Sequence, residues 1–297
     1  MTELERYLAE EVVEDHADGI ISRREAFRRL GMLGVGAGPA ATLLAAFPQA
    51  VTAAPASTTA AAVPPPALPT EAITYPGPDG RTLMGAWATA ESAAGGVLVI
   101  HENRGLTDHI RTVAGRFAAS GYAALAVDLL SEEGGTGSFA DPAEATAALN
   151  RAAPERFVAD MKATLSEIER RVPDRGLAAT GFCFGGAMTW RLLASDEPRL
   201  AAAAPFYGPF PENGDLSESR AAVLGMYAEL DARVNATRET ARTALEQAGL
   251  AHDIVTVPGV DHAFFNDTGA RYVEAAALQA YGRVLGWFGR SLVQPAK

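Results

Sequence analysis

Residues 181–186, Gly-Phe-Cys-Phe-Gly-Gly, constrain the fold more than any other stretch of this chain. They follow a short apolar run and precede residues 187–194, whose composition is typical of a helix. A strand, a sharp turn flanked by glycines and a helix together form a nucleophile elbow. The central residue of such a turn has a strained backbone, so the residues two positions before and after it must be small. The pattern therefore predicts that the turn holds Cys183 clear of a buried strand.

Cys183 also has a simpler interpretation, because a free cysteine packs well as a small buried hydrophobe. Core packing does not explain the glycines on both sides of it, however, and it is the only cysteine in the chain. The helix that follows would direct its N-terminal amides at this position, which stabilises a thiolate. We therefore interpret Cys183 as a nucleophile.

Length and charge narrow the choice of fold and partners. The 297 residues are enough for one large α/β domain or two smaller ones. The formal net charge of −11 argues against nucleic acids and anionic membranes as partners. A single cysteine excludes an internal disulfide but leaves the compartment open. We expect a monomer that acts on a small molecule.

Residues 1–53 have the order of an export signal, with a charged region, an uncharged run over 31–47 and small residues at 51–53. Residues 22–24, Ser-Arg-Arg, resemble the start of a twin-arginine signal, although Phe27 lies one position later than that pattern places it. We predict an exported protein, periplasmic or extracellular. The alternative is a cytoplasmic protein with an N-terminal helix, or a membrane anchor, for which the apolar run is short.

Beyond a linker at 54–70, rich in Ala, Pro and Thr, apolar runs alternate with helical patterns over 71–293. Continuous apolar runs are typical of strands buried on both faces. The chain therefore predicts one α/β domain with a mostly parallel, doubly wound sheet and helices on both faces. Residues 129–154 are polar and contain glycine, and we expect them to cover the substrate. The expected strands are 72–75, 82–87, 96–100, 123–128, 177–180, 200–208, 222–227 and 254–257, with helices over 108–119, 157–171 and 272–292.

A histidine and an acid should follow an elbow nucleophile, each at the carboxyl end of a strand, as in the α/β-hydrolase fold. His262 follows the last predicted strand, whereas His252 precedes it and lies at the wrong end. The acid should follow the preceding strand, where both Glu229 and Asp231 stand. We favour Asp231, because a short carboxylate commonly orients the histidine, and Glu229 stays open as the alternative.

These motifs resemble those of the dienelactone hydrolase family. The resemblance rests on Gly-x-Cys-x-Gly-Gly, on an acid 48 residues after the cysteine and on a His-x-Phe 31 residues after the acid. It also includes Glu102 after the third predicted strand, and it covers about residues 71–290. The resemblance implies an α/β-hydrolase fold and an enzyme that cleaves a carboxylic ester or lactone through a cysteinyl acyl-enzyme, with a Cys-His-Asp triad and no metal or cofactor.

The resemblance also implies roles for several neighbours of the triad. Glu102 would contact the resting thiol and take part in activating Cys183 when substrate arrives. The backbone N–H groups of Phe184 and Asn103 would form the oxyanion hole. We interpret His101 as a residue that lines the site or packs beside it.

One position departs from the family pattern. The founding enzymes have an arginine four residues after the histidine, which holds the carboxylate of the substrate, whereas this chain has Asn266. Arg151 or Arg156 could replace that clamp, so the charge of the substrate stays open. A thioesterase or peptidase with the same triad is an alternative, and a non-catalytic binding protein on the same scaffold is another.

Overall fold

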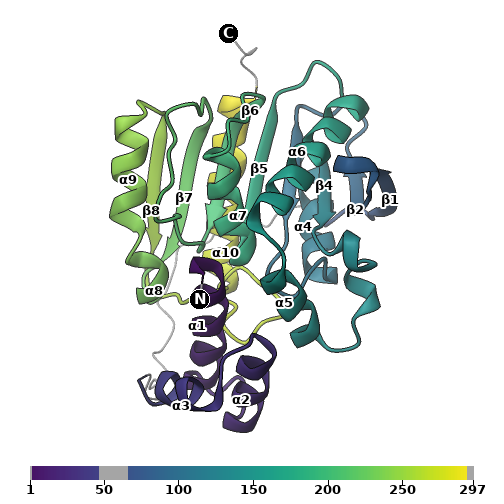
Figure 1. Cartoon of the computed structure of the whole chain (residues 1–297). Coiled ribbons are helices and arrows are strands. Elements are labelled where there is room, and N and C mark those ends of the chain that lie inside the picture. Colours follow the sequence, from purple (N-terminus) through teal and green to yellow (C-terminus); the bar gives the residue numbers. More distant parts are fainter. Residues whose placement is uncertain (1, 47–65, 293–297) are drawn as a thin grey trace.

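The computed structural model describes residues 2–46 and 66–292, and its central feature is an eight-stranded sheet (Figure 1). The strands lie in the order β1-β2-β4-β3-β5-β6-β7-β8. β1, β2 and β4 pair antiparallel at one edge, and from β4 to β8 every neighbouring pair is parallel. The strands are β1 Glu71–Pro76, β2 Thr82–Thr89, β3 Gly96–Ile100, β4 Ala123–Asp128, β5 Leu177–Phe182, β6 Leu200–Phe206, β7 Ala222–Ala228 and β8 His252–Val257.

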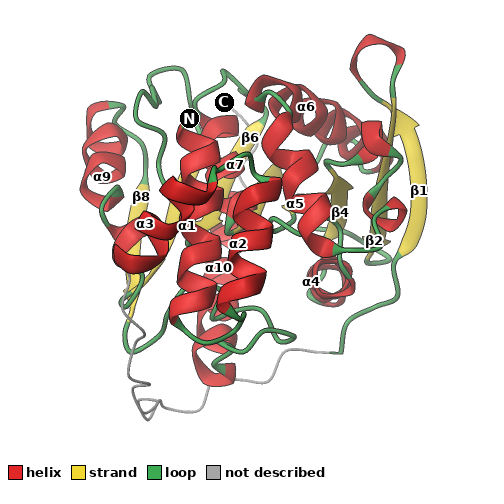
Figure 2. Cartoon of the chain, turned by 60° about the horizontal axis from the view of Figure 1, so that its bottom comes forward, coloured by secondary structure: helices red, strands yellow, loops and turns green. Residues whose placement is uncertain are grey.

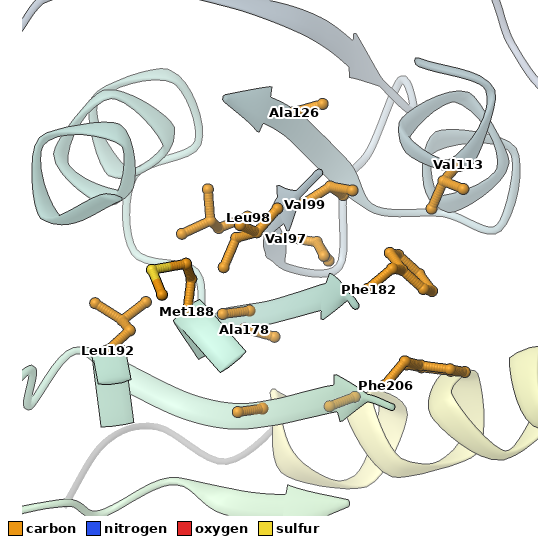
Figure 3. Packing of buried hydrophobic residues seen from close by; sticks show 14 of the residues in the cluster. Val97, Leu98, Val99, Val113, Ala126, Ala178, Phe182, Met188, Leu192 and Phe206 are labelled. Carbon is orange, nitrogen blue, oxygen red and sulfur yellow. The ribbon is translucent and has the colours of Figure 1, made fainter. Parts of the chain in front are cut away.

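The central strands are covered on both faces. Every residue of β3, β4 and β5 is buried, which explains their continuous apolar sequences. Figure 3 shows Val113 on one side of these strands, and Met188 and Leu192 on the other. The fold class predicted from the sequence is therefore confirmed: this is an α/β-hydrolase fold. The sheet and the helices that cover it, residues 71–292, are called the body. Its helices are α4 Asp108–Ala119, α5 Pro142–Arg151, α6 Pro154–Arg171, α7 Phe184–Leu193, α8 Ala232–Asn235, α9 Arg238–Gln247 and α10 Glu274–Ser291.

The stretch expected to cover the substrate contains structure that the sequence analysis did not predict. Residues 129–154 include two 3-10 turns, Ser131–Glu133 and Thr136–Ser138, and the helix α5. Asp141 caps α5 by accepting a hydrogen bond from the Ala143 amide at 2.9 Å. α8 and α9 were also not predicted, since α8 has only four residues and α9 is strongly polar.

Three further helices precede the body: α1 Glu3–Ala17, α2 Arg23–Met32 and α3 Ala37–Ala46. Figures 1 and 2 show them as a group at one end of the molecule, where α1 and α2 contact α5. The predicted cleavage site at 51–53 and most of the predicted linker lie outside the described residues. Among the helices that the structure describes, none is both long and apolar enough to cross a bilayer.

Candidate active site

Cys183 lies at the turn between β5 and α7, with φ 57° and ψ −117°. This conformation is rarely adopted by residues other than glycine, and such strain is concentrated at functional sites. The neighbouring glycines are required because the backbone is crowded. A Cβ at Gly181 would lie 2.1 Å from the carbonyl oxygen of Gly185, and one at Gly185 would lie 2.3 Å from that of Ile100. The local sequence therefore produces the elbow.

His262 and Asp231 form a buried pair beside the elbow. Nδ1 of His262 donates a hydrogen bond to Oδ2 of Asp231 at 2.6 Å. The other carboxylate oxygen accepts from the backbone amide of Val234 at 3.0 Å and so caps α8. These two bonds hold the imidazole in one orientation. The second ring nitrogen, Nε2, is buried and has no hydrogen-bond partner among the described residues.

The two alternatives from the sequence lie elsewhere. Glu229 accepts a hydrogen bond from the backbone amide of Gly259 at 2.7 Å in an exposed position. His252 begins β8 and bonds the carbonyl oxygen of Leu250 at 2.8 Å, at the amino end of the strand. The structure thus places Asp231 rather than Glu229 on His262.

Glu102 and Asn266 contact one another. Oε2 of Glu102 accepts a hydrogen bond from Nδ2 of Asn266 at 2.5 Å, and Oε1 is buried without a partner among the described residues. Glu102 was expected to contact the resting thiol of Cys183. In the structure, the carboxylate that accepts a hydrogen bond from this thiol belongs to Glu11 instead. Oδ1 of Asn266 accepts a hydrogen bond from the backbone amide of Thr268 at 2.9 Å, so both the amide nitrogen and the oxygen of its side chain have partners.

The loop after β3 lies next to the elbow because Ile100 pairs with Gly181 in the parallel register. Phe184 is the first residue of α7, so its N–H has no acceptor within the helix. Asn103 lies three residues beyond Ile100, and its carbonyl accepts from Thr146 at 2.9 Å. The two predicted oxyanion donors therefore lie at the start of α7 and in the neighbouring loop after β3.

His101 packs beneath the site. It is fully buried, Nδ1 lies 2.6 Å from the carbonyl of Glu102, and Nε2 accepts from the Leu129 amide at 3.1 Å. Burial lowers the pKa of His101. These contacts occupy both nitrogens of the neutral ring, in agreement with a packing role.

Neither of the two arginines considered as substitute clamps contacts the Cys183 thiol among the described residues. Arg156 pairs with Glu132 at 3.0 Å and with Glu133 at 2.7 Å, and its guanidinium also bonds the Leu129 carbonyl. Arg151 ends α5 and is exposed. The structure does not bring either of them to Cys183.

The sequence analysis missed the residues of α1 that lie in the site. The thiol of Cys183 lies 3.2 and 3.3 Å from the two carboxylate oxygens of Glu11, and the hydroxyl of Tyr7 lies 3.4 Å from Sγ. A signal for this helix was present, since Thr2 and Glu5 form a capping box. The export-like pattern of residues 1–53 had excluded it from the expected fold.

The electrostatics follow from this burial. Burial, with Glu11 as the next cause, raises the pKa of the Cys183 thiol to about 11. Burial also raises the pKa of Glu11. For His262, burial acts to lower the pKa, but Asp231 and Cys183 together raise it well above its ordinary value. Glu11 therefore opposes the thiolate that a nucleophile needs.

Glu11, Cys183 and His262 could also offer three ligands to a metal. Their ligand atoms lie within 4.8 Å of one another, and all three residues are buried. The contacts between Cys183 and Glu11 and between His262 and Asp231 account for these side chains without a metal.

Comparisons with known proteins point to the same fold class. A model of the dienelactone hydrolase family matches residues 83–292. A Salmonella typhi protein, provisionally named a carboxymethylenebutenolidase, is 34% identical over 207 residues, which cover 65% of this chain and 76% of that protein. A provisionally named dienelactone hydrolase from Klebsiella pneumoniae, solved by crystallography, is 31% identical with a TM-score of 0.65, and the match covers 74% of this chain and 99% of that one. The family match begins after α1, α2 and α3.

Proposed function

The chain belongs to the dienelactone hydrolase family and is a hydrolase similar to carboxymethylenebutenolidases, and we propose that it cleaves a carboxylic ester or lactone through a cysteinyl acyl-enzyme. The observation that carries the proposal is the strained Cys183 turn beside the buried His262–Asp231 pair. A nucleophile that stands clear of its strand, beside a histidine that can act as its base, accounts for both the strain and the paired histidine.

In the proposed reaction, the neutral form of His262 takes the thiol proton at Nε2, and the sulfur of Cys183 attacks the carbonyl carbon of the substrate. Asp231 stabilises the imidazolium that forms. The backbone amides of Phe184 and Asn103 bind the oxyanion of the tetrahedral intermediate. Its collapse breaks the bond to the alkoxide, which takes the proton from His262, and leaves a thioester on Cys183.

Water then completes the cycle. His262 removes a proton from the attacking water, and the carbonyl again becomes an oxyanion. The C–S bond then breaks to release the carboxylic acid, and the departing thiolate of Cys183 takes the proton back from His262. For a lactone the alkoxide and the acid are two ends of one product. The raised pKa of the thiol means that Cys183 stays protonated until substrate and catalytic base act together.

A panel of short-chain aryl esters and small lactones tests the proposal, measured with the wild-type chain and Cys183→Ala. Hydrolysis that depends on Cys183 supports it. Full activity in Cys183→Ala would contradict it, and cleavage of thioesters or peptides in preference to esters would favour the alternatives that share the triad.

We also propose export through the twin-arginine route. Arg23 and Arg24 are exposed at the start of α2, where a receptor could reach them. Cell fractionation followed by N-terminal sequencing tests this. A mature chain beginning near residue 54 outside the cytoplasm is expected, and full-length protein recovered only from the cytosol would argue against it.

A further inference from the structure

The space in front of the Cys183 thiol is filled by the chain's own α1. The Cys183 thiol donates a hydrogen bond to the carboxylate of Glu11, and it accepts one from the hydroxyl of Tyr7. Cys183 is 2% exposed, and His262 is 1% exposed. A substrate carbonyl must approach the sulfur to within about 3–3.5 Å before attack. In this conformation, side chains of α1 occupy the position that the substrate carbonyl would need.

Ion pairs along α1 fix it to the body. Glu3 pairs with Arg191 at 2.8 Å, and Glu14 pairs with Arg233 at 2.8 Å. Asp15 and Asp18, near the end of the helix, both bond Arg271, at 3.2 and 2.6 Å. An acidic helix thus lies across three arginines of the body, which come from α7, α8 and the segment before α10.

Arg233 has donors that α1 leaves unused. Its side chain is 9% exposed, Nη2 pairs with Glu14, and Nε and Nη1 are buried without hydrogen-bond partners among the described residues. The guanidinium lies over the ring of Tyr7, 4.5 Å from its centroid. It stands two residues after Asp231, on the same turn. Buried, unsatisfied donors on a charged group are costly, so they indicate a group that a carboxylate could bind with two parallel hydrogen bonds.

We propose that α1 is an intramolecular cap that imitates an anionic substrate, and that Arg233 binds the carboxylate of the real substrate once α1 has left. Glu11 occupies the position of the reacting carbonyl, and Glu14 holds one arm of the arginine. Arg233 thus supplies the group that binds the substrate carboxylate, which Asn266 does not. The part concerning Arg233 rests on the proposed hydrolase function, whereas the cap does not.

The cap is tested by the alkylation of Cys183, which requires no substrate. The charge-reversed chain Glu14→Lys, Asp15→Lys, Asp18→Lys removes the pairs with Arg233 and Arg271. We expect its iodoacetamide reaction to be at least tenfold faster than in the wild type. The matched control reverses three exposed charges on the body, Glu71→Lys, Glu91→Lys and Glu144→Lys. The control should react as slowly as the wild type, and an equal rate in all three folded chains would overturn the cap.

A second experiment tests the cap if the charge-reversed chain does not fold. A protease site is introduced within residues 47–65 of the full chain, the folded protein is cleaved, and the N-terminal fragment is removed by size exclusion in high salt. The opened protein should alkylate at least tenfold faster and hydrolyse a neutral aryl ester faster than uncleaved chain. Faster alkylation together with slower hydrolysis would overturn the cap, because α1 would then be part of the catalytic site.

The assignment of Arg233 is tested in the opened protein by kcat/KM for a carboxylate-bearing ester relative to its neutral analogue. We expect Arg233→Gln to lower this ratio at least tenfold and Arg233→Lys to recover part of it, while Arg191→Gln leaves the ratio as it was. An unchanged ratio in Arg233→Gln would contradict the assignment. Faster alkylation, with no hydrolysis of any ester by either the uncleaved or the opened protein, would contradict the proposed function and leave the cap standing.

Discussion

The body and the N-terminal helices are stabilised in different ways. The core of the body contains large side chains that are almost fully buried, among them Trp190, Phe117 and Phe206. In the separate core that α1, α2 and α3 share, the aromatic Phe27 packs only partly buried, and the buried residues are small or aliphatic: Ala9, Val12, Val13, Ala26, Leu30, Ala40 and Leu44. Burying large aromatic side chains stabilises far more than burying alanines. The comparison indicates that the body folds around its own core, and that the three N-terminal helices can separate from it.

α1 makes extensive contacts between the two regions, and α2 adds contacts with α5 and an ion pair between Arg28 and Asp141 at 2.7 Å. Leu4, Tyr7 and Leu8 belong to the core of the body, and the ion pairs with Arg191, Arg233 and Arg271 lie along the same helix. Partly buried ion pairs are sensitive to the removal of one partner, because the other charge is then left uncompensated. Substitutions at the contacts of α1 should therefore change access to the site without changing the body.

The largest expected effect lies in the body. Cys183→Ala should lower ester hydrolysis by about 10⁴-fold or more in both the capped and the opened protein, because no covalent intermediate can form. Iodoacetamide should label Cys183 and abolish hydrolysis in parallel. Initial rates and mass spectrometry of the labelled peptide measure this. Retained activity in the opened Cys183→Ala protein would show that the body does not work through the elbow.

The next effect concerns the orientation of His262. Asp231→Asn should lower kcat by about 10³- to 10⁴-fold, because an amide does not hold the tautomer that leaves Nε2 free to accept a proton. Glu229→Gln is the matched control, since its carboxylate bonds only the Gly259 amide among the described contacts. Circular dichroism checks that both fold. A greater loss in Glu229→Gln than in Asp231→Asn would exchange their roles.

These two predictions rest on residues whose positions the sequence already indicated. Gly181 and Gly185 are demanded by local backbone contacts, and His262 follows a strand whose apolar sequence marks it, so a short pattern was sufficient. The contact of Glu11 with Cys183 joins residues 172 positions apart in the sequence. No local pattern specifies such docking. The polar composition of 1–19 and the small residues of 31–53 are typical of a leader, which concealed the capping box and the apolar spacing of Leu4, Tyr7 and Leu8.

A smaller effect tests the contact between the two regions directly. Glu11→Gln in the full chain should lower the pKa of Cys183 below about 11, because a carboxylate that opposes the thiolate is removed while the burial that raises this pKa remains. The sign follows from the charge: with a neutral amide in that position, the thiolate forms at lower pH. Below the thiol pKa, alkylation becomes about tenfold faster per pH unit. The pH profile of iodoacetamide alkylation should therefore shift toward lower pH.

Tyr7→Phe serves as the control for that profile. It removes the hydroxyl that lies on Sγ but keeps the ring and the charge of Glu11. Its profile should shift toward higher pH, because a hydrogen bond that Tyr7 donates to the thiolate is lost. Two profiles that move in the same direction would show that packing of α1, rather than the charge of Glu11, controls the thiol.

The smallest expected effect concerns Asn266, which contacts Glu102. In the dienelactone pattern an arginine stands here, and a charge-assisted hydrogen bond contributes about 1.5–3 kcal/mol. In this chain Asn266 already donates to Glu102, so an introduced guanidinium would pair with that carboxylate first. Asn266→Arg in the opened protein should therefore raise the preference for a carboxylate-bearing ester by roughly threefold to tenfold, with Asn266→Gln as the neutral control. The measurement is kcat/KM for the anionic and the neutral ester. A loss of activity toward both would instead indicate that Asn266 holds Glu102 in the position that catalysis requires.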